Sequence, residues 1–317
     1  MRLLVILDPL PSIRTYKDST YAMMVEAAAR GHELFVCEQN ALSLARGRTM
    51  AHAAALRITD ATGSAASWYE EGEPRSEPVA AFDAVLMRKD PPFDMEYVFS
   101  TYLLEHAVRE GARVFNDPQA IRNHNEKLAI AEFAQFAPPT LVTRSADELR
   151  AFVDEHDEAV FKLLDGMGGT SVFRAKRGDP NISVIIETLN QFGARSVMAQ
   201  RFIPEISDGD KRVLLIGGQV VPYCLARIPK GGEFRGNLAA GARGVARPLS
   251  ARDREVGEAL APQLAARGLL LVGLDLIGDY VTEINVTSPT CFQEIRQQTG
   301  YDVAKLFIDA LEAACVR

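Results

Sequence analysis

Cysteine, histidine and long apolar runs are all scarce in this sequence of 317 residues, and each scarcity argues against a class of protein. The cysteines, Cys37, Cys224, Cys291 and Cys315, are scattered, with no C-x-x-C pair and no histidine at ligand spacing. A zinc site is therefore not expected, and reduced structural thiols are. The histidines lie neither at metal-ligand spacing nor beside a plausible nucleophile, so acid–base chemistry by histidine is not favoured.

Apolar runs are too short for a membrane protein. No stretch approaches the ~18 uninterrupted apolar residues that a membrane helix requires. The amino-terminal run, residues 3–7, is too short for the core of a signal peptide and ends at Asp8-Pro9. The formal net charge of −7 argues against broad binding to nucleic acid or membrane surfaces. We therefore expect a cytoplasmic protein without nucleic-acid or membrane partners.

The overall composition is that of an ordinary globular protein. Hydrophobic residues make up 47% of the chain and charged residues 24%, and the length allows two or three packed domains. The first domain is expected over residues 1–121. Strands at 3–7, 33–37, 82–88 and 113–115 alternate with helices at 19–30 and 95–110, which predicts a parallel, doubly wound sheet. Residues 48–78 give no clear assignment.

Polar residues follow the strands of this first domain. Asp8 ends one strand, and Arg88, Lys89 and Asp90 end another. Ligands bind beyond the carboxyl ends of the strands in such sheets, so this edge is a candidate binding site.

Two further domains are expected, over residues 122–200 and 201–317. The second is predicted as a compact antiparallel α+β module, with helices at 125–136, 146–156 and 182–190 and strands at 140–143, 159–164, 170–175 and 196–202. The third is predicted to contain strands at 212–216, 219–226, 270–277 and 281–286, helices at 251–267 and 302–314, and a glycine-rich loop at 228–247. Gly217-Gly218 is expected to form a hairpin turn.

A glycine-rich loop separates two predicted strands of the second domain. It contains Gly166, Gly168, Gly169 and Ser171, and its glycines would let backbone N–H groups approach phosphate oxygens. The spacing is not that of a Walker A loop, and no helix follows. The loop is either a flexible lid over a triphosphate or simply a glycine-rich turn.

Two lysines favour the phosphate interpretation. Lys162 stands inside an otherwise apolar strand, where an unpaired ammonium is costly to bury, so it is expected to face an anion or a carboxylate. Lys127 lies early in the predicted helix 125–136, near an end that favours anions. The alternative is that both side chains extend to the surface.

Asp275, Glu283 and Asn285 form a candidate metal site. Glu283 and Asn285 are two residues apart on a strand, so they share one face, and oxygen ligands suit Mg²⁺. A two-residue turn at 278–279 would pair Asp275 with Thr282 and place it on the opposite face. A three-residue loop at 278–280 would pair Asp275 with Glu283, which the metal site requires. The alternative is a solvated acidic face.

Residues 211–247 are strongly basic, with Glu233 as the only acidic residue. Arginine forks bind carboxylates and phosphates, and the interspersed glycines would make the segment mobile, as a closing lid must be. A solvated basic loop without a role is the alternative. Together with the lysines, the glycine loop and the acidic set, this segment points to phosphoryl chemistry from ATP.

Several strings in the sequence resemble those of a known family. The strings at 87–94, 165–169, 222–229, 235–241 and 282–290 are similar to those of prokaryotic glutathione synthetases, and the similarity runs nearly end to end. It is weakest between Thr49 and Val79, and Ala242 stands where a further glycine is usual. The resemblance implies an ATP-grasp fold behind an amino-terminal parallel-sheet domain, and a ligase that joins γ-glutamylcysteine and glycine with ATP.

The resemblance also implies a role for each candidate residue. It implies Mg²⁺, or Mn²⁺, as the metal, held by Asp275, Glu283 and Asn285, and a homotetramer or dimer. Arg212 and Arg227 would stabilise the transferring phosphate. Substrate contacts are implied for Arg88, Arg235, Asn237, Ser288 and Thr290. ATP contacts are implied for Lys127, Lys162, Gly166, Gly168, Gly169, Ser171, Gln200, Phe202 and Asp210, with Gln200 and Phe202 by the adenine and Asp210 by the ribose.

Two rival hypotheses remain. Another ATP-grasp ligase, such as one that joins D-alanines, would share Lys162 and Glu283 but not the strings at 87–94 and 288–290. A non-catalytic nucleotide-binding module would bind ATP without turnover.

Overall fold

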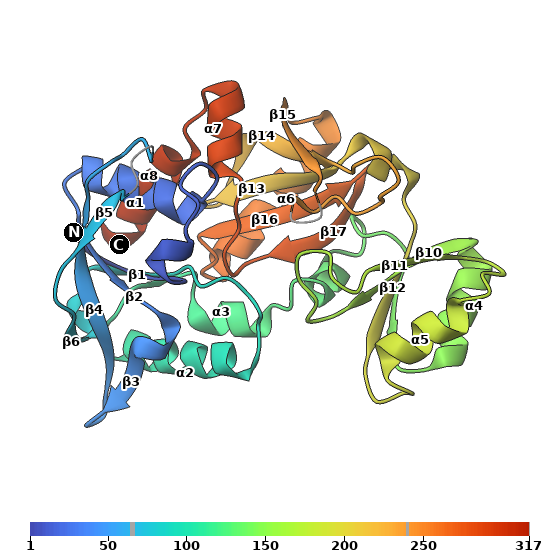
Figure 1. Ribbon diagram of the computed structural model, residues 1–317, viewed down its shortest axis with the longest axis horizontal. Coiled ribbons are helices and arrows are strands. Elements are labelled where there is room, and N and C mark those ends of the chain that lie inside the picture. Colours follow the sequence, from blue (N-terminus) through green and yellow to red (C-terminus); the bar gives the residue numbers. More distant parts are fainter. Residues whose placement is uncertain (64–66, 239–240, 317) are drawn as a thin grey trace.

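The computed structural model describes residues 1–63, 67–238 and 241–316. Ala239 and Ala240, which belong to the string at 235–241, lie outside the described residues. Within them, three sheets form, and the carboxy-terminal sheet lies between the amino-terminal domain and the smaller module (Figure 1). No helix in these ranges combines the length and apolar character needed to cross a membrane.

The amino-terminal sheet has the strand order β3-β4-β2-β1-β7-β8, in which β1 is parallel to β2 and β7, and β7 is parallel to β8. The predicted parallel sheet is thus confirmed. Its elements are β1 (Arg2–Ile6), α1 (Ser19–Ala29), β2 (Glu33–Cys37), β3 (Leu42–Ala45), β4 (Arg48–Ile58), β5 (Tyr69–Glu71), β6 (Arg75–Pro78), β7 (Ala84–Met87), α2 (Met95–Arg109), β8 (Val114–Phe115) and α3 (Pro118–Asn123).

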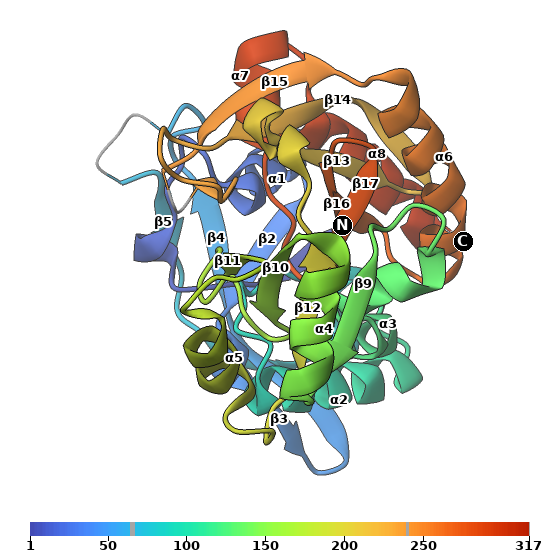
Figure 2. The same cartoon turned by 90° about the vertical axis from the view of Figure 1, so that its right-hand side faces the viewer.

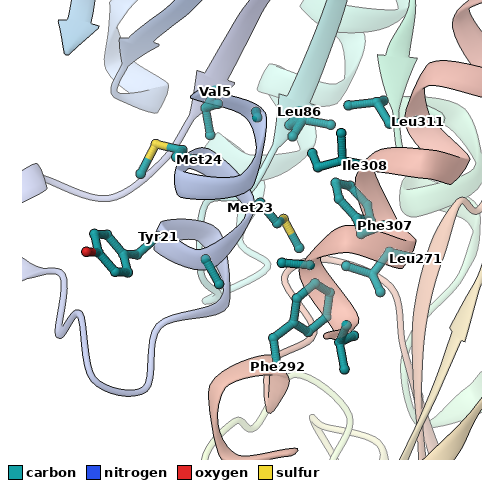
Figure 3. Packing of buried hydrophobic residues seen from close by; sticks show 14 of the residues in the cluster. Val5, Tyr21, Met23, Met24, Leu86, Leu271, Phe292, Phe307, Ile308 and Leu311 are labelled. Atoms are coloured by element: carbon teal, nitrogen blue, oxygen red, sulfur yellow. The ribbon is translucent and has the colours of Figure 1, made fainter. Parts of the chain in front are cut away.

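Both faces of this sheet are buried, which explains its continuous apolar strands. Leu3 and Val5 of β1 pack into a cluster with residues of α1 and with α8 (Val303–Val316), the last helix of the chain (Figure 3). Leu4 and Ile6 point the other way, into a cluster with α2. Helix α8 therefore completes the core of the amino-terminal domain although it lies nearly 300 residues downstream of β1.

Residues 48–78, which gave no clear assignment, contain β4, β5 and β6. Strand β4 is antiparallel to β2, β3, β5 and β6. Most of its buried positions hold alanine, namely Ala51, Ala53 and Ala54. Alanine has little strand preference, so the sequence pattern that indicates a strand was weak in β4.

The central module is an antiparallel sheet in the order β11-β10-β12-β9, with helices α4 and α5 packed on it (Figure 2). Its elements are η4 (Leu128–Phe133), β9 (Thr140–Thr143), α4 (Ala146–His156), β10 (Glu158–Leu163), β11 (Phe173–Lys176), α5 (Ile182–Asn190) and β12 (Val197–Arg201). Helices 146–156 and 182–190 have the predicted bounds.

The carboxy-terminal sheet has the order β15-β14-β13-β16-β17, with every neighbouring pair antiparallel. The hairpin turn at Gly217-Gly218 is confirmed, and both glycines have positive φ. The elements are β13 (Asp210–Ile216), β14 (Gln219–Ile228), β15 (Arg243–Pro248), α6 (Ala251–Ala266), β16 (Leu271–Ile277), β17 (Tyr280–Asn285), α7 (Phe292–Thr299) and α8.

The predicted helix at 125–136 is wrong, since the structure has a shorter 3-10 helix, η4, in its place. The side chain of Asn125 accepts hydrogen bonds from the backbone N–H groups of Lys127 and Leu128. The carbonyl of Glu126, which an α-helix would have used internally, accepts a hydrogen bond from Ile284 of strand β17, and the carbonyl of Phe136 accepts one from Val281 of the same strand. These partners hold the segment in an irregular path. Lys127 therefore precedes a 3-10 helix and not the start of a long α-helix.

Candidate active site

A cavity of about 450 Å³ lies where the carboxy-terminal sheet meets the glycine loop after β10 and the amino-terminal domain. Most of the candidate residues line it. They are Lys127, Lys162, Gly166, Gly168, Gly169, Gln200, Phe202, Asp210, Arg212, Arg227, Arg235, Asn237, Asp275, Glu283, Asn285, Ser288 and Thr290. Ser171 and Arg88 are not among the described residues that line the cavity, so the structure does not bring these two to the site.

Both lysines lie close to the carboxylate of Glu283. Nζ of Lys127 lies 3.8 Å from Oε1 of Glu283, and Nζ of Lys162 lies 3.7 Å from the same oxygen. Lys127 also donates a hydrogen bond to the carbonyl of Gly166 in the glycine loop, at 2.6 Å. Both ammonium groups are therefore turned into the cavity and not to the surface, and a polyanion entering there would meet them together.

The register of β16 and β17 decides the candidate metal site. The turn at 278–279 has two residues, which alone would pair Asp275 with Thr282. A bulge shifts the register, so that Leu276 pairs with Val281 while Asp275 pairs with Glu283. The required pairing is thus present, but it comes from a two-residue turn followed by a bulge and not from the three-residue loop that was expected to produce it. The bulge turns Asp275 and Glu283 to the same face.

Asp275 is held by a buried network of arginines. Its Oδ1 accepts a hydrogen bond from Nε of Arg212 at 2.5 Å, and its Oδ2 lies 2.9 Å from Nη2 of Arg227. Arg227 also pairs with Asp210, at 2.6 Å. Burial would raise the pKa of Asp275, but the two guanidinium charges outweigh burial and hold that pKa below its usual range. Burial raises the pKa of Asp210.

The oxygens of β17 fit a hard divalent cation. Glu283 offers a carboxylate, and the Nδ2 of Asn285 donates to the carbonyl of Gly273 at 3.2 Å, which leaves the amide oxygen for a cation. Asp275 fits less well, because both of its oxygens already bind arginine. In the described ranges, no group of three or more His, Cys, Asp or Glu side chains is placed so that the protein alone could hold a metal ion. A cation here would therefore need oxygens from the phosphates as well.

The two glycine-rich loops meet over the cavity. Nη1 of Arg235 donates to the carbonyl of Gly169 at 3.1 Å. A Cβ built on Gly169 would lie 2.4 Å from Oδ1 of Asn237, and Gly169 has a φ of +80°. Glycine at 169 is thus favoured by the backbone conformation, and a side chain there would also displace Asn237 of the second loop.

Another part of the cavity lining is suited to a base and a sugar. Phe202 lines it, and the guanidinium carbon of Arg174 lies 3.7 Å from the centre of the Phe202 ring. Gln200 is buried beside it and donates to Thr140. The Oδ1 of Asp210 is buried and has no hydrogen-bond partner among the described residues, so it can accept a bond from a ligand hydroxyl.

Sequence reasoning missed Glu126, which also lines the cavity. Its carboxylate accepts a hydrogen bond from Oγ1 of Thr287 at 3.0 Å. Burial and then the charge of Glu283 raise the pKa of Glu126. Its position beside Lys127 in the sequence was the available signal. Asp90, marked only as a strand-end residue, also reaches the cavity, where Ser288 donates to its carboxylate.

Comparison with known families covers nearly the whole chain. Residues 1–122 match the family described as prokaryotic glutathione synthetase, N-terminal domain. Residues 126–300 match prokaryotic glutathione synthetase, ATP-grasp domain.

Individual relatives agree with these families. The glutathione synthetase of Ralstonia nicotianae is 60% identical, over 99% of this chain and 96% of the relative. The glutathione synthetase of Nitrosomonas europaea is 58% identical, over 100% of this chain and 99% of the relative. Among solved structures, a D-cycloserine synthetase superposes with a TM-score of 0.69 at 17% identity, covering 99% of each chain. The D-alanyl-alanine synthetase A of Vibrio cholerae superposes with a TM-score of 0.58 at 13% identity, covering 100% of this chain and 99% of that one. At such low identities, these two similarities show only that the fold is shared. With both of its parts matched and relatives of such high identity, the chain belongs to the prokaryotic glutathione synthetase family and has the ATP-grasp fold.

Proposed function

We propose that this protein joins γ-glutamylcysteine and glycine to form glutathione, with ATP converted to ADP and phosphate. The observation that carries the proposal is the convergence of Lys127 and Lys162 on Glu283 inside one cavity. Cationic side chains facing a carboxylate that can bind a metal are what a triphosphate and its counter-ion require. Family membership supports the same reaction.

The nucleotide is proposed to lie along the cavity between the two sheets. Its phosphates would lie by Lys127 and Lys162 under the glycine loop, its adenine by Gln200 and Phe202, and its ribose by Asp210. The unpaired Oδ1 of Asp210 supports the ribose contact. Ser171 is kept in this proposal only as part of the loop, because it does not reach the lining among the described residues.

We propose Mg²⁺, or Mn²⁺ in its place, as the divalent metal. Glu283 and Asn285 would hold it, and Asp275 would contribute only if it gave up an arginine contact. When bound, such a cation neutralises charge on the phosphate oxygens.

The reaction is proposed to pass through an acyl phosphate. The cysteinyl carboxylate of the dipeptide attacks the γ-phosphorus and ADP leaves; the glycine amine then attacks the acyl carbon, a proton is lost from nitrogen, and phosphate leaves. Arg212 and Arg227 would stabilise the charge on the transferring phosphate. Arg235, Asn237, Ser288 and Thr290 would hold the substrates, and the touching loops would exclude water, which would otherwise hydrolyse the acyl phosphate.

The test is a coupled assay of ADP release with defined acceptor pairs. Turnover with γ-glutamylcysteine plus glycine, and glutathione as the product, supports the proposal. Turnover with D-alanine and none with γ-glutamylcysteine would assign the chain to the rival ligase activity. ATP binding with no turnover on any pair would support a passive nucleotide-binding module.

We also propose a homo-oligomer, a tetramer or a dimer. Helix α2 exposes Met95, Phe99 and Tyr102, spaced so that they share one helix face, with 59%, 49% and 53% of their surface accessible. A second copy of the chain packed on this apolar face would cover it. Light scattering should show a smaller assembly for Phe99→Asp than for the unmodified protein. An unchanged mass for Phe99→Asp would show that this face is not the contact.

A further inference from the structure

The segment at 286–289, which follows strand β17, is held by side chains from outside its own sheet. Asn116 is the first of them. Its Nδ2 donates to the carbonyls of Leu271 and Val286, at 2.7 and 2.8 Å, and its Oδ1 accepts from the N–H of Leu271 at 2.9 Å. The side chain is 5% exposed. Both donors of this amide are therefore used to bridge the neighbouring ends of β16 and β17.

Arg88 holds the far end of the same segment. Its Nη2 donates to the carbonyl of Pro289 at 2.9 Å, and its Nε donates to Oγ1 of Thr20 at 3.1 Å. It is buried, and it lies behind the cavity lining as the structure describes it. Arg88 directly follows β7 and Asn116 directly follows β8, and these parallel strands are neighbours. The two anchors thus come from the same edge of the amino-terminal sheet.

The two residues between these anchors are held through their side chains. Thr287 donates through Oγ1 to Glu126 at 3.0 Å, and Ser288 donates through Oγ to Asp90. Every residue from Val286 to Pro289 therefore has a hydrogen bond to a side chain of another part of the chain. A segment outside regular structure is usually mobile, and these bonds restrict this one.

The segment at 286–289 connects the proposed metal ligands to the proposed substrate contacts. Glu283 and Asn285, the proposed metal ligands, precede it on β17, while Ser288 and Thr290, proposed to contact substrate, lie in it or follow it. A shift at 286–289 would therefore move the substrate side chains relative to the metal ligands. Misplacement of reacting groups by about 1 Å can reduce a rate by about 10²-fold.

We infer that Asn116 and Arg88 are positioning residues for the ligation, which hold the segment at 286–289 so that the dipeptide carboxylate is aligned with the γ-phosphate. The inference rests on the proposed function, and it gives Arg88 an indirect role in place of the direct substrate contact that the family resemblance implies. No motif in the sequence marks Asn116 as part of the site. Its role becomes visible only when Leu271 and Val286 are brought beside it.

The experiment compares Asn116→Ala and Asn116→Asp with a matched control, Asn190→Ala. Asn190 is also a buried asparagine whose Nδ2 donates to a carbonyl, that of Arg144 at 3.0 Å, but it lies in the central module away from the cavity lining. For each protein, KM for γ-glutamylcysteine, KM for ATP, kcat, the melting temperature and the ratio of ADP to glutathione formed are measured. Asn116→Asp keeps the acceptor but removes both donors, and sets a carboxylate oxygen against two carbonyls.

For the Asn116 variants we expect KM for γ-glutamylcysteine to rise about tenfold or more, or kcat to fall by as much, with KM for ATP within about twofold. More ADP should form per glutathione, because a misplaced acyl phosphate meets water before glycine. Asn190→Ala should lose a similar amount of melting temperature with unchanged kinetics. Equal kinetic changes in Asn190→Ala and the Asn116 variants, or unchanged kinetics in folded Asn116 variants, would overturn the inference.

A second variant keeps the test decisive if the Asn116 proteins do not fold. Thr287→Val preserves side-chain shape and removes only the bond to Glu126, and a rise of about threefold in KM for γ-glutamylcysteine is expected from the loss of one hydrogen bond. An unchanged KM in Thr287→Val would then refute the inference. Failure of the unmodified protein to make glutathione would instead refute the proposed function.

Discussion

The two sides of the cavity differ in how they are built. The wall formed by β13, β14, β16 and β17 presents charges that are buried and paired, such as Arg212 with Asp275. The loops facing it are rich in glycine, and their ion pairs, such as Arg195 with Asp165, are partly exposed to solvent. A rigid wall can hold charge at a fixed place, whereas loops can open for substrate entry and then exclude water. The difference is consistent with the proposal that the wall fixes the charged groups while the loops exclude water.

The largest expected effect comes from breaking the wall network. Asp275→Asn leaves Arg212 and Arg227 buried without their shared carboxylate, and should lower the free energy of unfolding by about 3–5 kcal/mol. The matched change in a loop, Asp165→Asn, breaks an exposed pair and should cost below about 1 kcal/mol. Urea denaturation of both variants measures the difference. Similar losses in the two would show that the wall pairs are no more important to stability than surface pairs.

The next largest effect concerns the proposed metal ligand in the wall. Glu283→Gln keeps the shape of the side chain but removes the charge that faces Lys127 and Lys162. We expect kcat/KM to fall about 10²-fold or more and half-maximal activation to need more Mg²⁺. A titration of Mg²⁺ at saturating ATP measures both quantities. Normal activation by Mg²⁺ in this variant would exclude Glu283 as a ligand.

A smaller effect is expected in the glycine loop. Gly169→Ala combines a positive φ with a Cβ 2.4 Å from Asn237, whereas Gly168→Ala has a φ of +62° and nothing within 4 Å of its Cβ. A non-glycine residue in this conformation costs about 1–2 kcal/mol, so Gly168→Ala reports strain alone. Steady-state kinetics should show Gly169→Ala at least about tenfold below Gly168→Ala in kcat/KM. Equal values would mean that the loops do not meet during turnover.

The smallest effect tests the contact between the loops. Arg235→Lys keeps the positive charge but loses the fork that reaches the carbonyl of Gly169. One partly buried hydrogen bond is worth about 0.5–1 kcal/mol, so ADP release without glutathione should rise about two- to fivefold. The amount of ADP formed in the absence of glycine measures this leak. A leak equal to that of the unmodified protein would show that closure does not depend on Arg235.

Most of the fold followed from local patterns in the sequence. Helices 146–156 and 182–190 were predicted to the residue because each has a clear apolar period. The segment at 125–136 failed because its carbonyls bond to β17, which is some 150 residues downstream. Strand β4 was missed because alanines occupy most of its buried positions.

The sequence indicated which residues form the candidate site, but it did not show which of them contact one another. Lys162 and Glu283 could be chosen because charges inside apolar strands need an explanation. The pairing of Asp275 with Glu283 depends on a bulge that leaves no pattern in the sequence. The engagement of Asp275 by Arg212 and Arg227 and the burial of Arg88 depend on packing between distant segments.

The most direct test of the central claim is a crystal structure with a non-hydrolysable ATP analogue and Mg²⁺. We expect the triphosphate between Lys127, Lys162 and the glycine loop, with the metal about 2.0–2.1 Å from oxygens of Glu283 and Asn285. A nucleotide bound elsewhere, or in this cavity with the metal held by neither of those residues, would contradict the central claim.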